Sequence, residues 1–173
     1  MSVPHAILNP STQLKNGKNN MNATLTISQA RQVIDQSVND ISTITNENAE
    51  TIAYAINNEV QLRDYILGLP KSHDLDNCIN FVDTVASKVS EISRYALFTL
   101  NSVFNFEAGN LAKAKELNAI VADTKPDYSL NNLVTRVIDA NWSKDAFAQM
   151  RNSLAHQVEA ILDEISDTEI VAE

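Results

Sequence analysis

The stretch FTLNSVFNFEAGNLAKAKELNAIVADTKP, residues 98–126, decides the fold, because two helix-forming segments meet there at a single break. Gly109 stands between the segments, and glycine accepts backbone angles of a tight turn that other residues resist. Pro126 closes the second segment, since proline cannot continue a helix interior. The stretch therefore predicts a helical hairpin, with helices at about 94–107 and 110–124.

This hairpin resembles one unit of a tetratricopeptide repeat, a helix–turn–helix motif of about 34 residues. The matching positions are the first aromatic residue, the small crossing residues, the turn and the closing proline: Phe98, Ser102, Gly109, Leu111, Ala114 and Pro126. Asn101, Asn105 and Asn118 stand where the repeat usually has apolar or aromatic residues. We therefore expect a single repeat-like hairpin without a standard peptide-binding groove, since stacked arrays need about three copies.

Helical patterns extend on both sides of the hairpin. A first helix begins after Thr26 or Ser28, and a second is capped by Thr45 or Asn46. Residues 59–67 form another short helix or a continuation of the second. The remaining helices are expected from Asp74 to Ile92, and at 128–141 and 144–166. The fold class is therefore all-α, an irregular helical bundle of about six to seven helices that contains one tetratricopeptide-like hairpin.

Two of these helices carry a regular apolar stripe, which is typical of a face turned toward a core. The stripe after Asp74 consists of Leu75, Cys78, Ile79, Val82, Val85, Ala86, Val89 and Ile92. The stripe of the last helix consists of Phe147, Met150, Leu154, Val158, Ile161, Leu162 and Ile165. Cys78, the only cysteine, is interpreted as a small buried hydrophobe.

The chain divides into three parts by composition. Residues 1–25 are polar and contain three of the helix breakers, so they are predicted to form a flexible arm. Residues 26–166 form a single helical domain, and residues 167–173 form an acidic tail.

The charge balance excludes several classes of partner. The 22 Asp and Glu outnumber the 13 Lys and Arg, and the cations are scattered. Direct nucleic-acid binding and attraction to an anionic membrane are therefore not expected. No secretory signal and no run of about 18 apolar residues occurs, so we expect a soluble, cytoplasmic protein.

Sequence motifs of enzymes are missing. The chain has no Cys-x-x-Cys, His-x-x-x-His or Gly-x-Ser-x-Gly, and three glycines cannot build a phosphate-binding loop. We therefore predict no catalytic residues, no cofactor and no metal site. His156 is interpreted as an interfacial residue of the last helix.

Six residues are candidates for an interaction surface. Tyr128 and Trp142 are either packed corner residues or aromatic anchors of an interface. Asp163, Glu164, Asp167 and Glu169 form either a solvated acidic end or a docking strip for a basic partner.

The wider run of residues 95–142 is similar to the C-terminal helical part of an uncharacterised actinobacterial family, a domain of unknown function. The resemblance rests on the Ala-Gly-Asn turn at 108–110, the alanines 112 and 114, the Pro-Asp-Tyr-Ser-Leu start at 126–130 and residues 141–145. It covers about half of the chain and implies a helical fold without an assigned activity.

Two functions remain open from the sequence. The first is a non-enzymatic helical module that binds a protein partner or itself. The second is an acidic inhibitor or nucleic-acid mimic, of a kind suited to a phage or mobile element, that binds a basic protein. The net charge of −9 motivates the second hypothesis.

Overall fold

The computed structural model describes residues 25–171, and the side chains of this range through Thr168. All regular elements in this range are helical, which confirms the all-α prediction there. The α-helices are α1 (Ile27–Asn39), α2 (Asn46–Asn58), α3 (Val60–Gly68), α4 (Leu75–Lys88), α5 (Tyr95–Glu107), α6 (Leu111–Thr124), α7 (Ser129–Asp139) and α8 (Lys144–Val171). Three short 3₁₀ turns are η1 (Ile41–Thr43), η2 (Leu69–Lys71) and η3 (Glu91–Ser93).

The described part of the chain has eight α-helices, so the predicted number of about six to seven is wrong. The difference arises at Glu59, where the backbone is extended with φ −114° and ψ 105°. The Glu59 N–H donates to the Ala55 carbonyl at 2.7 Å, which closes α2 before the chain turns. Residues 60–68 therefore form a helix of their own.

Local capping chemistry sets several boundaries where the sequence predicts them. Thr26 and Gln29 form a reciprocal capping box at the start of α1, and Thr45 accepts from the Asn48 N–H at 3.1 Å. Gly109 has a left-handed φ of 85° at the end of α5. The N–H of Asn110 reaches back to the Asn105 carbonyl at 2.8 Å, which completes a Schellman turn.

The stripe that begins at Leu75 is shorter than predicted. Helix α4 ends at Lys88, and residues 91–93 form a 3₁₀ turn instead of continuing the helix. Ile92 is 86% exposed, so its assignment to the core stripe is wrong. Cys78 is fully buried, as predicted.

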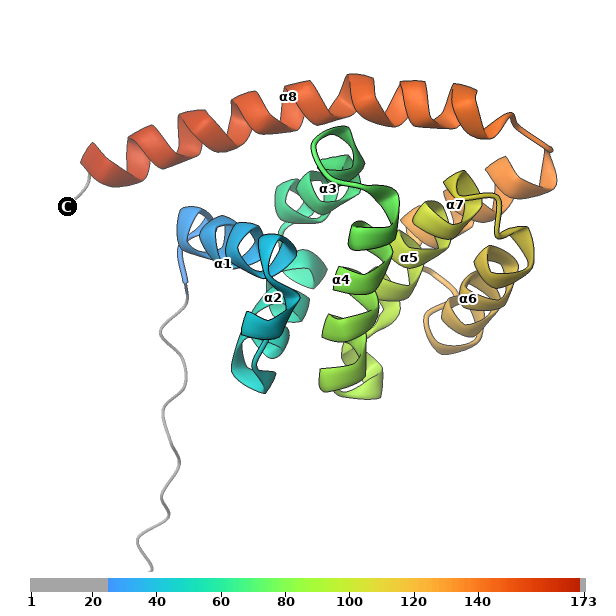
Figure 1. Ribbon diagram of the computed structural model, residues 1–173, viewed down its shortest axis with the longest axis horizontal. Helices are drawn as coiled ribbons and strands as arrows, with labels where there is room; N and C mark the ends of the chain where they lie inside the picture. The colour runs from blue at the N-terminus through green and yellow to red at the C-terminus, as the bar shows by residue number, and fades with distance from the viewer. Residues whose placement is uncertain (1–24, 172–173) are drawn as a thin grey trace, which may run out of the picture.

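Helix α8 crosses one side of the bundle formed by α1–α7, from α7 at one end to α1 at the other (Figure 1). Helix α5 lies in the middle, where ten of its thirteen residues are buried. It makes the most extensive helix–helix contact of the described residues with α6. The largest side chains of the core come from several helices: Ile34, Ile52, Leu62, Ile66, Phe81, Leu97, Leu100, Phe104 and Leu162.

The asparagines of the α5–α6 hairpin cross-link the bundle from inside. Asn101 is 1% exposed and donates to the Asp83 carboxylate on α4. The Asn105 amide donates to Asn101 Oδ1 at 2.6 Å. On the other side, the Asn131 amide of α7 donates to the Asn118 carbonyl of α6 at 3.1 Å. Buried amides that are paired in this way fix one arrangement of neighbouring helices.

Helix α3 and helix α8 lie close together at Gly68. A Cβ atom placed on Gly68 would lie 2.9 Å from the Cβ of Ala155. Carbon atoms in contact are normally about 3.5–4.0 Å apart, so the glycine is required by α8 and not by its own backbone angles.

We predict that Gly68→Ala lowers the free energy of unfolding by about 1–3 kcal/mol in urea titrations, because α8 must move away from α3. Adding Ala155→Gly should recover part of this loss, although glycine costs about 1 kcal/mol of helix propensity. Ala160→Gly, at an exposed position of α8, is the matched control and should recover nothing. A Gly68→Ala variant as stable as the wild type would contradict the close approach.

Candidate interaction surface

A buried ion pair fastens α8 to the bundle. Arg151 of α8 donates to the two carboxylate oxygens of Glu107, at the end of α5, at distances of 2.6 Å and 2.9 Å. A third N–H of Arg151 donates to the Leu67 carbonyl near the end of α3, at 3.2 Å. The side chains of Arg151 and Glu107 are only 3% and 7% exposed. One guanidinium thus joins three helices.

The sequence analysis did not predict this ion pair, although the position of Arg151 on α8 indicates that its charge is buried. Arg151 lies four residues after Phe147 and four before Ala155, so it shares their buried face of α8. A charged residue at such a position needs a partner, because an unpaired buried charge is strongly destabilising. The sequence does not reveal that Glu107 is the partner, since 44 residues separate the two.

Apolar side chains of α8 are also packed against the bundle. Phe147 is 4% exposed and meets Phe106 edge-on, with the ring centres 5.8 Å apart. Ala155 and Leu162 are also buried. Buried side chains therefore hold α8 against the bundle along its length from Phe147 to Leu162.

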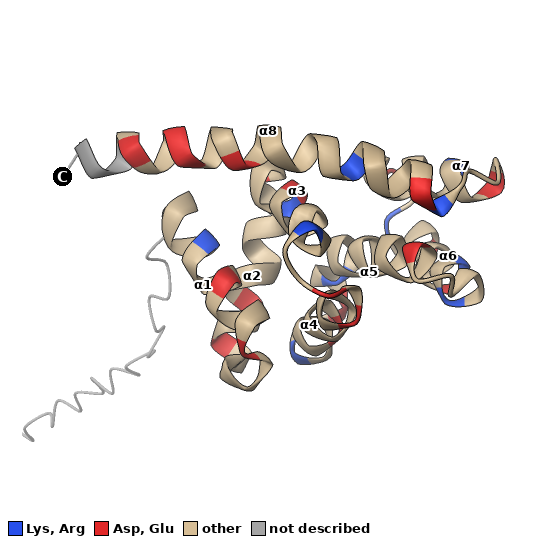
Figure 2. Cartoon of the chain, turned by 45° about the horizontal axis from the view of Figure 1, so that its top comes forward, with Lys and Arg blue, Asp and Glu red and all other residues tan. Residues whose placement is uncertain are grey.

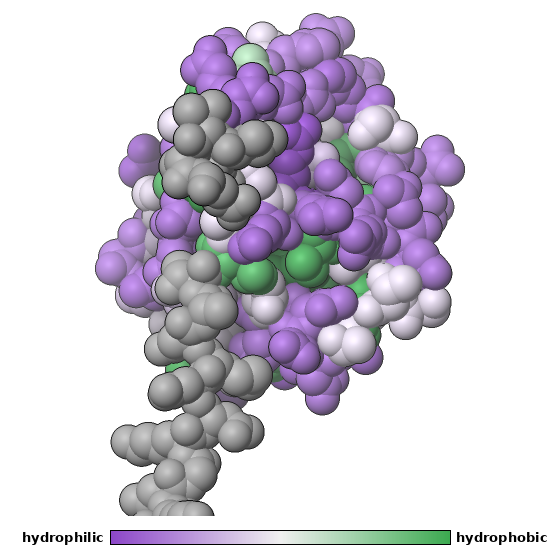
Figure 3. Space-filling model, turned by 90° about the vertical axis from the view of Figure 1, so that its left-hand side faces the viewer, coloured by the Kyte–Doolittle hydropathy of each residue, from purple (hydrophilic) through white to green (hydrophobic). Residues whose placement is uncertain are grey.

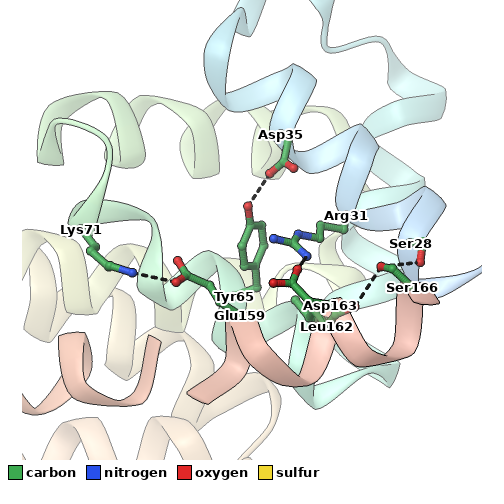
Figure 4. A network of polar contacts seen from close by, with 9 residues as sticks. All are labelled: Ser28, Arg31, Asp35, Tyr65, Lys71, Glu159, Leu162, Asp163 and Ser166. Carbon is green, nitrogen blue, oxygen red and sulfur yellow. Dashed lines mark hydrogen bonds and ion pairs between the residues drawn. The ribbon is translucent and has the colours of Figure 1, made fainter. Parts of the chain in front are cut away.

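Polar contacts join the C-terminal half of α8 to α1 and to η2 (Figure 4). Arg31 of α1 pairs with Asp163 of α8 at 2.7 Å and lies over the Tyr65 ring, 5.0 Å from its centre. The Tyr65 hydroxyl donates to Asp35 at 2.6 Å. Burial, together with the bond to Asp35, raises the pKa of Tyr65 to about 12.

Two further contacts extend this polar region. Lys71 pairs with Glu159 at 2.7 Å, and the Ser28 hydroxyl bonds to the Ser166 hydroxyl at 2.9 Å. Figure 3 shows the side of the molecule where α1 and the C-terminal end of α8 lie. The surface there is mainly hydrophilic, with a hydrophobic patch in its middle. Exposed ion pairs contribute about 0–1 kcal/mol each, so the buried Leu162 and the half-buried Val158 also hold this half of α8.

The outer face of α8 carries an exposed apolar strip of Met150, Leu154 and Ile161. These side chains are 38%, 46% and 43% exposed. The predicted stripe of this helix is therefore only partly a core face: Phe147 and Leu162 are buried and Val158 and Ile165 half-buried, but the three strip residues face solvent. The reason is that Arg151 and Ala155 turn a neighbouring face of α8 toward the bundle.

The two candidate aromatic residues differ in exposure. Tyr128 is half-buried and meets Tyr95 edge-on, with ring centres 4.8 Å apart. Burial raises the pKa of Tyr128. Trp142 is 48% exposed between α7 and α8. Asn141 has a left-handed φ of 53°, and the Trp142 N–H donates to the Val137 carbonyl at 3.3 Å. These features form a second Schellman turn, which fixes the backbone of Trp142 at the end of α7.

The structure describes three of the four candidate acidic side chains, and their surroundings differ. Asp163 is engaged with Arg31, whereas Glu164 and Asp167 are exposed and form no ion pair with the described side chains. Glu169 lies in α8, which continues to Val171 beyond the predicted end at 166, but its side chain is outside the described residues. Figure 2 shows Asp and Glu recurring along the C-terminal half of α8.

Reactive groups are few in the described region. Burial raises the pKa of the Cys78 thiol to about 12, so the thiol stays protonated at neutral pH. His156 is exposed beside Lys71, with 3.1 Å between its Nδ1 and the lysine Nζ. Among residues 25–168, no group of three or more His, Cys, Asp or Glu could hold a metal ion.

The helices of this region include none that is long and apolar enough to cross a membrane.

No family model, curated protein or solved structure matches this chain.

We predict that Glu107→Gln lowers the free energy of unfolding by about 3 kcal/mol, because Arg151 keeps a buried charge without its counter-ion. The apolar double variant Glu107→Leu/Arg151→Met should be more stable than Glu107→Gln. Asp163→Asn, which breaks the exposed pair with Arg31, is the control and should cost less than about 1 kcal/mol. If urea unfolding gave equal losses for Glu107→Gln and Asp163→Asn, the ion pair would not have the role described.

Proposed function

We propose that this chain is a non-enzymatic helical module that binds another protein through the exposed apolar strip of α8. The strip residues Met150, Leu154 and Ile161 carry the proposal, because exposed apolar side chains that share one face of a helix are a mark of interaction sites. From Met150 to Ile161 the strip extends about 16 Å along the helix axis, at about 1.5 Å per residue.

The spacing of the strip suits a partner helix. Its members lie four and seven residues apart, with Gln157 at the intervening position, which is the alternation of a helix–helix seam. Ser153 and Ala160 flank the strip with small exposed side chains, which allow a second helix to come close. We therefore propose an amphipathic helix as the bound element.

Three further sequence-based predictions belong to this proposal: the repeat-like hairpin, the family resemblance and the cytoplasmic location. We propose that the tetratricopeptide-like hairpin, α5 and α6, serves as a scaffold, because the side chains of its Asn101 and Asn105 are buried and hydrogen-bonded within the bundle. The similarity to the family of unknown function is compatible with a scaffold of this kind. We also propose a cytoplasmic location for the module.

An acidic inhibitor or nucleic-acid mimic is the second candidate, and one observation favours it. Glu164 and Asp167 are exposed near the end of α8, without an ion pair in the described region. Asp163 already pairs with Arg31, and the side chain of Glu169 lies outside the described residues, so Glu164 and Asp167 carry this candidate. Loss of binding to a basic partner in Glu164→Gln/Asp167→Asn would favour this candidate.

The test compares partner recovery by tagged wild type, Met150→Gln/Leu154→Gln and the control Ile92→Gln in cells of the natural source. Ile92 is 86% exposed and lies outside α8. We expect the double variant to lose a partner at least about tenfold in quantitative mass spectrometry, equal to about 1.4 kcal/mol, while the control retains it. The purified partner should then show the same difference in Kd. Partners that are recovered equally by all three proteins would contradict the proposal.

A further inference from the structure

The exposed strip of α8 lies in a part of the helix that has little exposed charge. Between residues 146 and 161, the types Asp, Glu, Lys and Arg are represented by two residues. Arg151 is buried, and Glu159 pairs with Lys71 at 2.7 Å. The strip itself carries no formal charge, and a depletion of charge is typical of the core of a protein–protein interface.

Two unpaired carboxylates follow the strip toward the end of α8. Glu164 comes three residues after Ile161 and lies about one turn further along the same side of the helix, and Asp167 follows after a further turn. Both side chains are exposed and form no ion pair with the described side chains. No Lys or Arg follows Arg151 in the sequence, and the C-terminal end of a helix carries the negative end of its dipole. The surface of α8 therefore changes from apolar to anionic along the helix (Figure 2).

We infer, on the basis of the proposed function of the strip, that its partner is a basic amphipathic helix. The apolar residues of that helix cover the strip, and Lys or Arg residues at one of its ends lie beside Glu164 and Asp167. Charge complementarity then sets the direction of the bound helix. Reversal would move its cations to the start of α8, where the exposed Lys144 and Asp145 leave no net charge and the helix dipole is positive.

The two parts of this surface contribute differently to binding. Burial of the apolar strip supplies most of the affinity, because exposed charge pairs contribute little each. The carboxylates select a basic partner and orient it. An acidic inhibitor would show the opposite balance, with binding that depends on the carboxylates and not on the strip.

Fluorescence anisotropy with two labelled synthetic peptides and the full chain tests the inference. Both peptides are amphipathic helices of about 20 residues, or about 30 Å, with Leu along one face and Ala and Gln elsewhere. One peptide has several Lys at its C-terminal end, and the other has Glu at the same positions. The Lys peptide should bind at least about tenfold more tightly at about 0.1 M salt. The difference should shrink at about 1 M salt, since the Debye length falls from about 10 Å to about 3 Å.

A charge-matched pair of double variants locates the carboxylates that select the peptide. Glu164→Gln/Asp167→Asn should weaken binding of the Lys peptide about three- to tenfold and leave the Glu peptide no weaker. The control Glu91→Gln/Asp123→Asn also removes two exposed carboxylates, but outside α8, and should leave both affinities unchanged. Equal effects of the two variants overturn the inference, because general attraction to an acidic chain then explains the binding.

The strip variant Met150→Gln/Leu154→Gln separates the inference from the proposed function. It should weaken binding of the Lys peptide at least about tenfold, with its helices retained in circular dichroism. If both peptides bind the wild type equally and both are lost in this variant, the basic partner is wrong and the proposed function stands. If the Lys peptide binds the variant as tightly as the wild type, both are wrong. A chain that binds neither peptide overturns the inference, while partner recovery by the strip variant still tests the proposed function.

Discussion

The rest of the structure depends on the burial of one charge, that of Arg151. Its guanidinium is enclosed by the bundle and must be met there by Glu107 and by the Leu67 carbonyl. These three groups come from α8, α5 and α3, so satisfying the charge fixes the position of α8 relative to both other helices. Because a mispositioned α8 would leave the charge unpaired in a dry environment, alternative placements of the helix are disfavoured.

The position of α8 determines which of its faces is available. Phe147, Arg151, Ala155 and Leu162 are turned toward the bundle, and Gly68 leaves room for Ala155. Met150, Leu154 and Ile161 are consequently turned outward. The exposed strip is thus a consequence of the same contact that stabilises the fold.

Much of the fold was predictable because its signals are local. Thr26 and Thr45 cap their helices through their own side chains, and Gly109 supplies the left-handed residue that ends α5. The number of helices was not predictable in the same way, because the break at Glu59 involves no glycine or proline. The exposed strip was not predicted: Met150, Leu154 and Ile161 belong to a sequence pattern typical of a core face, and such a pattern cannot tell which of two adjacent apolar faces of α8 is buried. The hydrogen-bond partners of Asn101 and Asn105 were also not predictable from the sequence, because tertiary contacts determine them.

Hydrogen–deuterium exchange of the α8 amides tests the central claim, that the Arg151–Glu107 pair holds α8 in place, most directly. In the wild type, the amides around Arg151 should be protected as strongly as those of α5. In Glu107→Gln, α8 should lose protection before α4 and α5 do, since local opening exposes the most weakly held element first. Equal loss of protection across α4, α5 and α8, or unchanged protection of α8, would contradict the account.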